Sequence, residues 1–71
     1  MKKRQLTTLL RQLRLDAGLT QVDLADRLGQ TQSYVSKYES GEQRLDLIEI
    51  EAICKAVGTP LKKFIERYLE S

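Results

Sequence analysis

Two short apolar patterns with helical spacing lie close together in residues 20–39, separated by one glycine. Side chains three or four positions apart share one face of a helix, so each pattern predicts a helix with a buried face. Gly29 lies between the patterns, where the chain must reverse and a residue free to adopt positive φ is favoured. The inward positions are Leu24, Ala25 and Leu28 in the first helix and Val35 and Tyr38 in the second. Residues 20–40 therefore predict a helix-turn-helix.

Three further apolar stripes predict helices at about residues 5–17, 46–57 and 60–70. All four glycines of the chain fall just past a predicted helix end, which supports these boundaries. Thr20 and Asp46 each precede an acidic residue by three positions, the spacing of a capping box. The buried stripe expected for residues 46–57 is Leu47, Ile50, Ile53, Cys54 and Val57. The 71 residues form one domain, and the predicted fold class is all-α, a compact five-helix bundle.

Composition restricts the chemistry that the chain can perform. It has no histidine, so His-based metal sites and the usual general base are missing. Its single cysteine, Cys54, has no partner for an internal disulfide, which fits a reducing cytoplasm. Cys54 also falls on a predicted buried stripe, so we expect it to be a core residue. The sequence also lacks an apolar run of about eighteen residues, a glycine-rich phosphate loop and a nucleophile–base pair. We therefore expect a cytoplasmic protein that is not an enzyme and uses no metal and no cofactor.

The second helix of the motif has an outward face of mostly short polar side chains. These residues are Gln32, Ser33, Ser36 and Lys37. A helix face that is merely solvated favours longer charged residues, whereas glutamine can pair with adenine and lysine with guanine in the major groove. The net charge is only +2, but the positive excess lies before residue 45, in the part that contains the motif. We expect these four residues to contact base edges of double-stranded DNA; the alternative is an ordinary solvated face.

Residues 5–65 closely resemble the phage-repressor (Cro/repressor, or Xre) helix-turn-helix family. The resemblance rests on the segments LDAGLTQ (15–21), LADRLG (24–29) and SYVSKYESG (33–41). It implies a five-helix DNA-binding domain that acts as a dimer on a palindromic operator. It also implies that Gln21 holds a phosphate, that Gln32 and Ser33 face bases, and that Arg14 of the first helix pairs with Glu39. The sequence departs from the best-known phage repressors at Tyr34 and Lys37.

A second group of residues, around the motif helices, is expected to contact DNA phosphates. Gln21 begins the first motif helix, where backbone N–H groups favour an anion. Backbone N–H groups and the Arg44 guanidinium follow the second motif helix and can hold the sugar–phosphate backbone. The full set is Gln21, Thr31, Tyr34, Gly41, Gln43 and Arg44. The alternatives are that Tyr34 covers the rim of the core and that Arg44 is simply solvated. A basic arm at residues 1–4 either follows the DNA backbone or is solvated.

The last predicted helix, residues 60–70, has more apolar surface than one small core needs. The residues expected at a dimer interface are Phe64, Ile65, Tyr68 and Leu69. A two-fold dimer built there would set the second motif helices of the two copies about 34 Å apart, which is one turn of DNA. The alternative is that this helix only closes the core of a monomer.

These observations together predict a transcriptional regulator that binds DNA in a sequence-specific manner. The expected mode is a homodimer on a palindromic operator, with repression as the outcome. Two alternatives remain open from the sequence. One is a protein-interaction module, such as the antitoxin partner of a toxin, and the other is a restriction–modification controller that acts as an activator.

Overall fold

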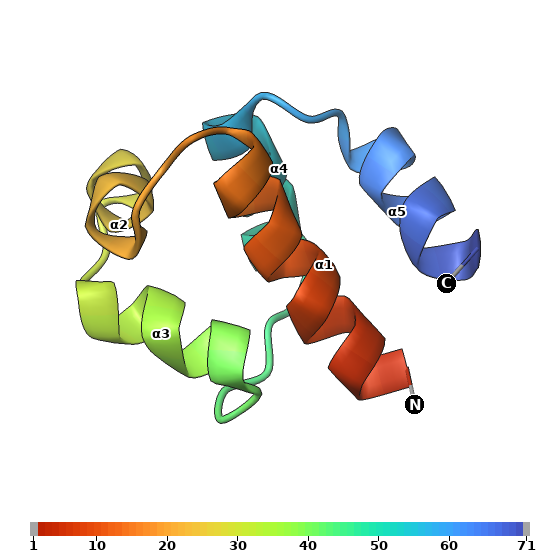
Figure 1. The fold of residues 1–71 in the computed structure, drawn as a ribbon, viewed down its shortest axis with the longest axis horizontal. Helices are drawn as coiled ribbons and strands as arrows, with labels where there is room; N and C mark the ends of the chain where they lie inside the picture. Colours follow the sequence, from red (N-terminus) through yellow and green to blue (C-terminus); the bar gives the residue numbers. More distant parts are fainter. Residues whose placement is uncertain (1, 71) are drawn as a thin grey trace.

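The computed structural model describes the backbone of residues 2–70 and the side chains of residues 5–70. Residues 2–70 form five α-helices and no strand (Figure 1). The helices are α1 (Lys2–Asp16), α2 (Gln21–Leu28), α3 (Gln32–Ser40), α4 (Leu47–Val57) and α5 (Leu61–Glu70). The predicted all-α, five-helix fold is confirmed.

The helices are arranged so that α2 and α3 lie together at one end of the molecule (Figure 1). In this view α1 crosses the middle with α4 behind it, and α5 lies at the opposite end from α2. Both α2 and α3 also pack against the centre of the bundle, α2 on α4 and α3 on α1. The helix-turn-helix is therefore an integral part of the bundle.

Local interactions explain where the motif helices begin and end. Thr20 and Asp23 form the expected capping box of α2, each side chain accepting a hydrogen bond of 3.0 Å from the backbone N–H of the other. Thr31 caps α3 by accepting the N–H of Tyr34 at 3.2 Å. Gly29 has φ of 66°, which lets its N–H close the end of α2 on the carbonyls of Ala25 and Asp26. Only two residues then separate this cap from α3.

The core contains side chains from all five helices. The buried apolar residues are Leu10, Leu13, Leu24, Ala25, Val35, Tyr38, Ile50, Ile53, Cys54 and Phe64. The inward face predicted for the motif is confirmed, since its members are buried except for Leu28, which is half-buried. The α2–α3 pair is thus held by apolar burial on its inner side, and its outer side is left to solvent.

The predictions for Leu47, for Phe64 and for the start of the first helix differ from the structure. Leu47 was assigned to the buried stripe of α4 but is 61% exposed, because Ile50 and Ile53 set the inward direction and Leu47 lies at its edge. Phe64 was assigned to a dimer interface but is 1% exposed in the core, so it is buried before any partner binds. The backbone of residues 2–4 is helical, since α1 begins at Lys2. Met1 and the side chains of residues 2–4, expected to form a basic arm, lie outside the described part of the chain.

Candidate nucleic-acid interface

The outward face of α3 is a polar surface. All four side chains predicted to contact bases are exposed there, namely Gln32, Ser33, Ser36 and Lys37. On the inner side of the same helix, Val35 and Tyr38 are buried to 0% and 1% exposure. The outer face offers amide, hydroxyl and ammonium groups, which are the groups that read base edges in a major groove. An α-helix with short side chains also has a diameter that the major groove admits.

Capping interactions at both ends hold α3 in a defined position. At its start, Thr31 accepts the Tyr34 N–H through Oγ1, and the hydroxyl hydrogen of Thr31 is left to donate elsewhere. At its end, the Ser40 hydroxyl donates to the carbonyl of Lys37 at 3.0 Å. The polar outward face is therefore presented by a helix whose ends are both fixed, as a recognition surface requires.

A buried ion pair connects α1 to the end of α3. Arg14 donates from Nε to Glu39 Oε2 at 2.8 Å and from Nη2 to Glu39 Oε1 at 3.0 Å. Its Nη1 donates to the carbonyl oxygen of Leu19 at 2.9 Å. The side chains of Arg14 and Glu39 are only 9% and 4% exposed, and the hydrogen bond to Glu39 raises the pKa of Arg14. The predicted pair is present, and its burial leaves Arg14 a structural role without direct contact to a ligand.

Gln21, the first residue of α2, joins the same carboxylate. Its Nε2 donates to Glu39 Oε1 at 3.2 Å, and its side chain is half-buried. An amide nitrogen has two hydrogens, so one remains to donate to an anion in front of the α2 N-terminus. Glu39 therefore orients Gln21 while pairing with Arg14, a link across three helices that spacing along the chain did not indicate.

Tyr34 has a different partner from the phosphate considered in the sequence analysis. Its hydroxyl donates to Glu49 Oε2 of α4 at 3.0 Å, and its ring meets Tyr38 edge-on with centroids 5.5 Å apart. Burial, followed by the bond to Glu49, raises the pKa of Tyr34 to about 12. A phosphate at this hydroxyl would lie beside the Glu49 carboxylate and be repelled. The structure therefore supports the alternative role, in which Tyr34 covers the rim of the core.

The loop after α3 contains three residues predicted to contact phosphate, Gly41, Gln43 and Arg44. The N–H of Gly41 bonds to the carbonyl of Tyr38 at 3.3 Å, and the N–H of Gln43 bonds to that of Lys37 at 3.3 Å. These N–H groups cap α3, so neither Gly41 nor Gln43 has its backbone N–H free for the predicted phosphate contact. The side chain of Gln43 is half-buried and that of Arg44 is exposed. Both can still donate to an anion.

Apolar side chains are exposed on α4 and α5. Ile48 and Leu47 at the start of α4 are 77% and 61% exposed, and Leu69 of α5 is 68% exposed. Ile65 and Tyr68 are half-buried. The sequence pattern predicts the α5 residues at a surface, but it places Leu47 in the core and gives no signal for Ile48. The exposed apolar surface thus extends over α4 as well as α5.

The described residues offer little support for catalysis or metal binding. Cys54 is buried, and burial raises the pKa of its thiol, which keeps it protonated and poorly nucleophilic. No group of three or more Cys, Asp or Glu side chains within the described part of the chain is placed to hold a metal ion. None of the described helices is long and apolar enough to cross a membrane.

Comparison with known proteins identifies the family. A profile described as helix-turn-helix matches residues 10–64. An XRE-family like protein from Pseudomonas syringae pv. tomato str. DC3000 is 40% identical, with 97% of this chain and 84% of that chain aligned and a TM-score of 0.90. A mutant of the restriction–modification controller protein C.Esp1396I is 25% identical, with 97% and 92% aligned and a TM-score of 0.90. That controller as a tetramer in complex with its natural 35-base-pair operator is 24% identical, with 99% and 92% aligned and a TM-score of 0.88.

A search of curated proteins gave no match. The helix-turn-helix profile spans most of this chain, and the alignment with the Pseudomonas protein covers 97% of this chain. The chain belongs to the XRE-type helix-turn-helix family.

Proposed function

We propose that this protein is a sequence-specific DNA-binding transcriptional regulator that inserts α3, its recognition helix, into the major groove. The observation that carries the proposal is the exposed polar face of α3, held in position by caps at both ends and by the Arg14–Glu39 pair. Gln32 and Lys37 provide the groups that discriminate adenine and guanine, and Ser33 and Ser36 are short enough to allow close approach. Binding rather than catalysis is the proposed activity.

Phosphate contacts on both sides of the recognition helix would fix its register on the duplex. Gln21 offers its second amide hydrogen at the α2 N-terminus, and the Thr31 hydroxyl offers its hydrogen at the start of α3. Gln43 and Arg44 offer side-chain donors at the far end. With a net charge of only +2, the chain relies on a few well-placed donors rather than on a strongly basic surface.

We propose that the regulator acts as a homodimer on a palindromic operator. The exposed apolar side chains of α4 and α5 (Leu47, Ile48 and Leu69) are the surface that a second copy would cover. A two-fold dimer would place two recognition helices one DNA turn, about 34 Å, apart. In the controller protein C.Esp1396I, the same fold is found as a tetramer on its operator.

Repression is the proposed regulatory outcome, because occupancy of an operator by a dimer needs only the recognition face and the apolar patch. The proposed site of action is the cytoplasm, where the unpaired thiol of Cys54 would stay reduced. The similarity to a restriction–modification controller keeps control of such a system as a second candidate role.

Selection of bound sequences from a random DNA pool tests the proposal. We expect enrichment of a symmetric site, with two half-sites separated by about one helical turn. The Gln32→Ala/Lys37→Ala double variant should fold normally and lose the enrichment. Lys62→Ala, which removes an exposed lysine from α5, is the matched control and should keep it. Equal enrichment by the double variant would refute the role of α3, and absence of any DNA binding would favour a protein-interaction module.

A further inference from the structure

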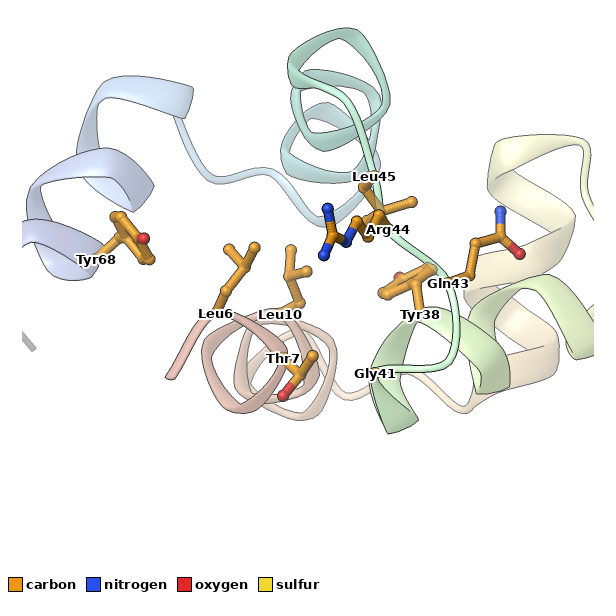
Figure 2. Close-up of a pocket in the computed structure, with 9 residues that line it drawn as sticks. All are labelled: Leu6, Thr7, Leu10, Tyr38, Gly41, Gln43, Arg44, Leu45 and Tyr68. Carbon is orange, nitrogen blue, oxygen red and sulfur yellow. The ribbon is translucent and has the colours of Figure 1, made fainter. Parts of the chain in front are cut away.

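A pocket of about 250 Å³ lies behind the recognition helix (Figure 2). Its apolar part consists of Leu6 and Leu10 from α1 and Leu45 from the loop before α4. The lining also includes Tyr38 of α3 and Arg44 of the same loop, and both of these residues carry a polar group. A cavity of about 150 Å³ lined by apolar residues is already large enough for benzene. The pocket therefore has room for a small organic molecule.

Two residues that line this pocket carry polar groups with no partner within the described part of the chain. The Tyr38 hydroxyl is buried and makes no hydrogen bond. Buried hydroxyls nearly always have a partner, so an unpaired one calls for an explanation. The Arg44 guanidinium makes no hydrogen bond or ion pair with a described residue. Figure 2 shows it on the α1 side of the loop, close to Leu10 in the view, while Gln43 points the other way.

We propose that this pocket binds a small organic carboxylate with an apolar body. The carboxylate would accept hydrogen bonds from Arg44, and from the Tyr38 hydroxyl once a small shift of neighbouring side chains uncovers that buried oxygen. The body would pack on Leu6, Leu10 and Leu45. A guanidinium presents a planar pair of donors that matches a carboxylate. Arg44 is the single cationic residue among the described lining residues, so it balances one negative charge. Burial raises the pKa of Tyr38, so its hydroxyl remains a donor at neutral pH.

A bound carboxylate would also oppose DNA binding, and this part of the inference rests on the proposed function. Arg44 is one of the groups proposed to contact phosphate, and the loop that carries it forms one wall of the pocket. One guanidinium cannot hold the ligand carboxylate and a DNA phosphate in the same position. Ligand and DNA would therefore weaken each other's binding by the same factor.

Binding of the ligand is tested without DNA, with benzoate and hexanoate as probes and benzamide and hexanamide as neutral controls. The 71-residue protein is titrated while backbone amide signals are followed by NMR. We expect at least one carboxylate to shift signals around Leu6, Leu10 and Leu45, and to bind about tenfold more tightly than its amide. Absence of binding by both carboxylates, equal binding of acids and amides, or shifts confined to another region would each overturn the proposal.

Two variants test the named donors. Arg44→Gln should remove most of the preference for the acid over the amide, whereas Arg67→Gln, the same change on the exposed side of α5, should keep it. Tyr38→Phe should weaken carboxylate binding while leaving the fold intact, because no hydrogen bond to a described residue is lost. An unchanged acid preference in Arg44→Gln would refute the assignment of the carboxylate to this residue.

The effect on DNA is tested separately with an operator found by selection. Saturating carboxylate should weaken operator binding by the wild type but leave Arg44→Gln almost unaffected. If a probe occupies the pocket and operator affinity is unchanged, the regulatory coupling is wrong while the ligand site stands. If the protein binds no DNA at all, the proposed function fails and the NMR titration still decides on the pocket.

Discussion

The guanidinium of Arg14 and the carboxylate of Glu39 are joined by two hydrogen bonds, 2.8 Å from Nε and 3.0 Å from Nη2. The same carboxylate accepts a third hydrogen bond from Gln21 at 3.2 Å. One buried acidic side chain thus links α1, the start of α2 and the end of α3. The position of the recognition helix relative to the rest of the bundle depends on this contact as well as on apolar packing.

Removal of one member of this pair should be strongly destabilising. Glu39→Ala leaves the Arg14 guanidinium buried without its counter-ion, and we expect the free energy of unfolding to fall by about 3–5 kcal/mol. Denaturant unfolding followed by helical circular dichroism measures the loss. The Arg14→Leu/Glu39→Leu double variant removes both charges. Its loss of unfolding free energy should be smaller than the sum of the losses in Arg14→Leu and Glu39→Leu. A single variant as stable as the wild type would show that the pair has no structural role.

Lys37→Ala should change which DNA sequence is preferred. If Lys37 donates to a guanine edge, its removal should cost about 1–3 kcal/mol on the selected operator and relax the preference at one position per half-site. Binding titrations against the operator and single-base variants of it measure both effects. An equal loss of affinity on every sequence would instead assign Lys37 to a phosphate.

Arg44→Gln and Gln21→Ala should weaken binding to all DNA sequences, but they should differ in their dependence on salt. Without the Arg44 charge, DNA binding should release about one counterion fewer. The magnitude of the slope of log K against log salt should therefore decrease by about one. Gln21 is neutral, so its loss should leave the slope unchanged and cost about 0.5–1.5 kcal/mol. Titrations at several salt concentrations separate the two. Unchanged slopes in both variants would contradict a phosphate contact by Arg44.

Tyr34→Phe should affect stability rather than DNA binding. At neutral pH it removes the bond to Glu49, with an expected loss of about 0.5–1.5 kcal/mol. Folding raises the pKa of Tyr34 from 10.0 to about 12, so the folded state holds the phenol proton more tightly. The resulting stabilisation is complete below the unfolded pKa and is lost as the pH rises through the folded value.

The pH dependence provides the check on this role. Between about pH 10 and pH 12 the wild type should lose more stability than Tyr34→Phe, as measured by denaturant unfolding. A variant with unaltered stability and weakened operator binding would restore the phosphate contact that the sequence first suggested.

Ile48→Lys should dissociate the proposed dimer. Ile48 is 77% exposed in the single chain, so lysine is tolerated by the fold but would place a charge in an apolar interface. Leu69→Lys should act in the same way, because Leu69 is 68% exposed on α5. Leu15→Lys, at a residue 48% exposed on α1, is the control and should remain dimeric. Light scattering at high micromolar concentration measures the mass, and a monomeric wild type would contradict the dimer.

The sequence alone determined the helices and the polar outward face of α3, because both are local properties. The capping residues at Thr20 and Asp46 and the glycines after the helices act within a few residues of chain. Apolar spacing inside a short helix assigned Val35 and Tyr38 to the core, and the opposite face followed from the geometry of the helix. The pairing of Arg14 with Glu39 came from the resemblance to a family rather than from spacing.

The tertiary structure decided the partners that lie far apart in sequence. Tyr34 and Glu49 are 15 residues apart, and Gln21 and Glu39 are 18 apart, so only the crossing of the helices brings them within hydrogen-bond distance. The tertiary structure also decided which side of α4 and of α5 is packed against other helices. Helical periodicity gives the centre of an apolar face, but neighbouring helices set its edges, so Leu47 is exposed and Phe64 is buried. The pocket beside Tyr38 has the same origin, since three segments distant in sequence must pack together to enclose it.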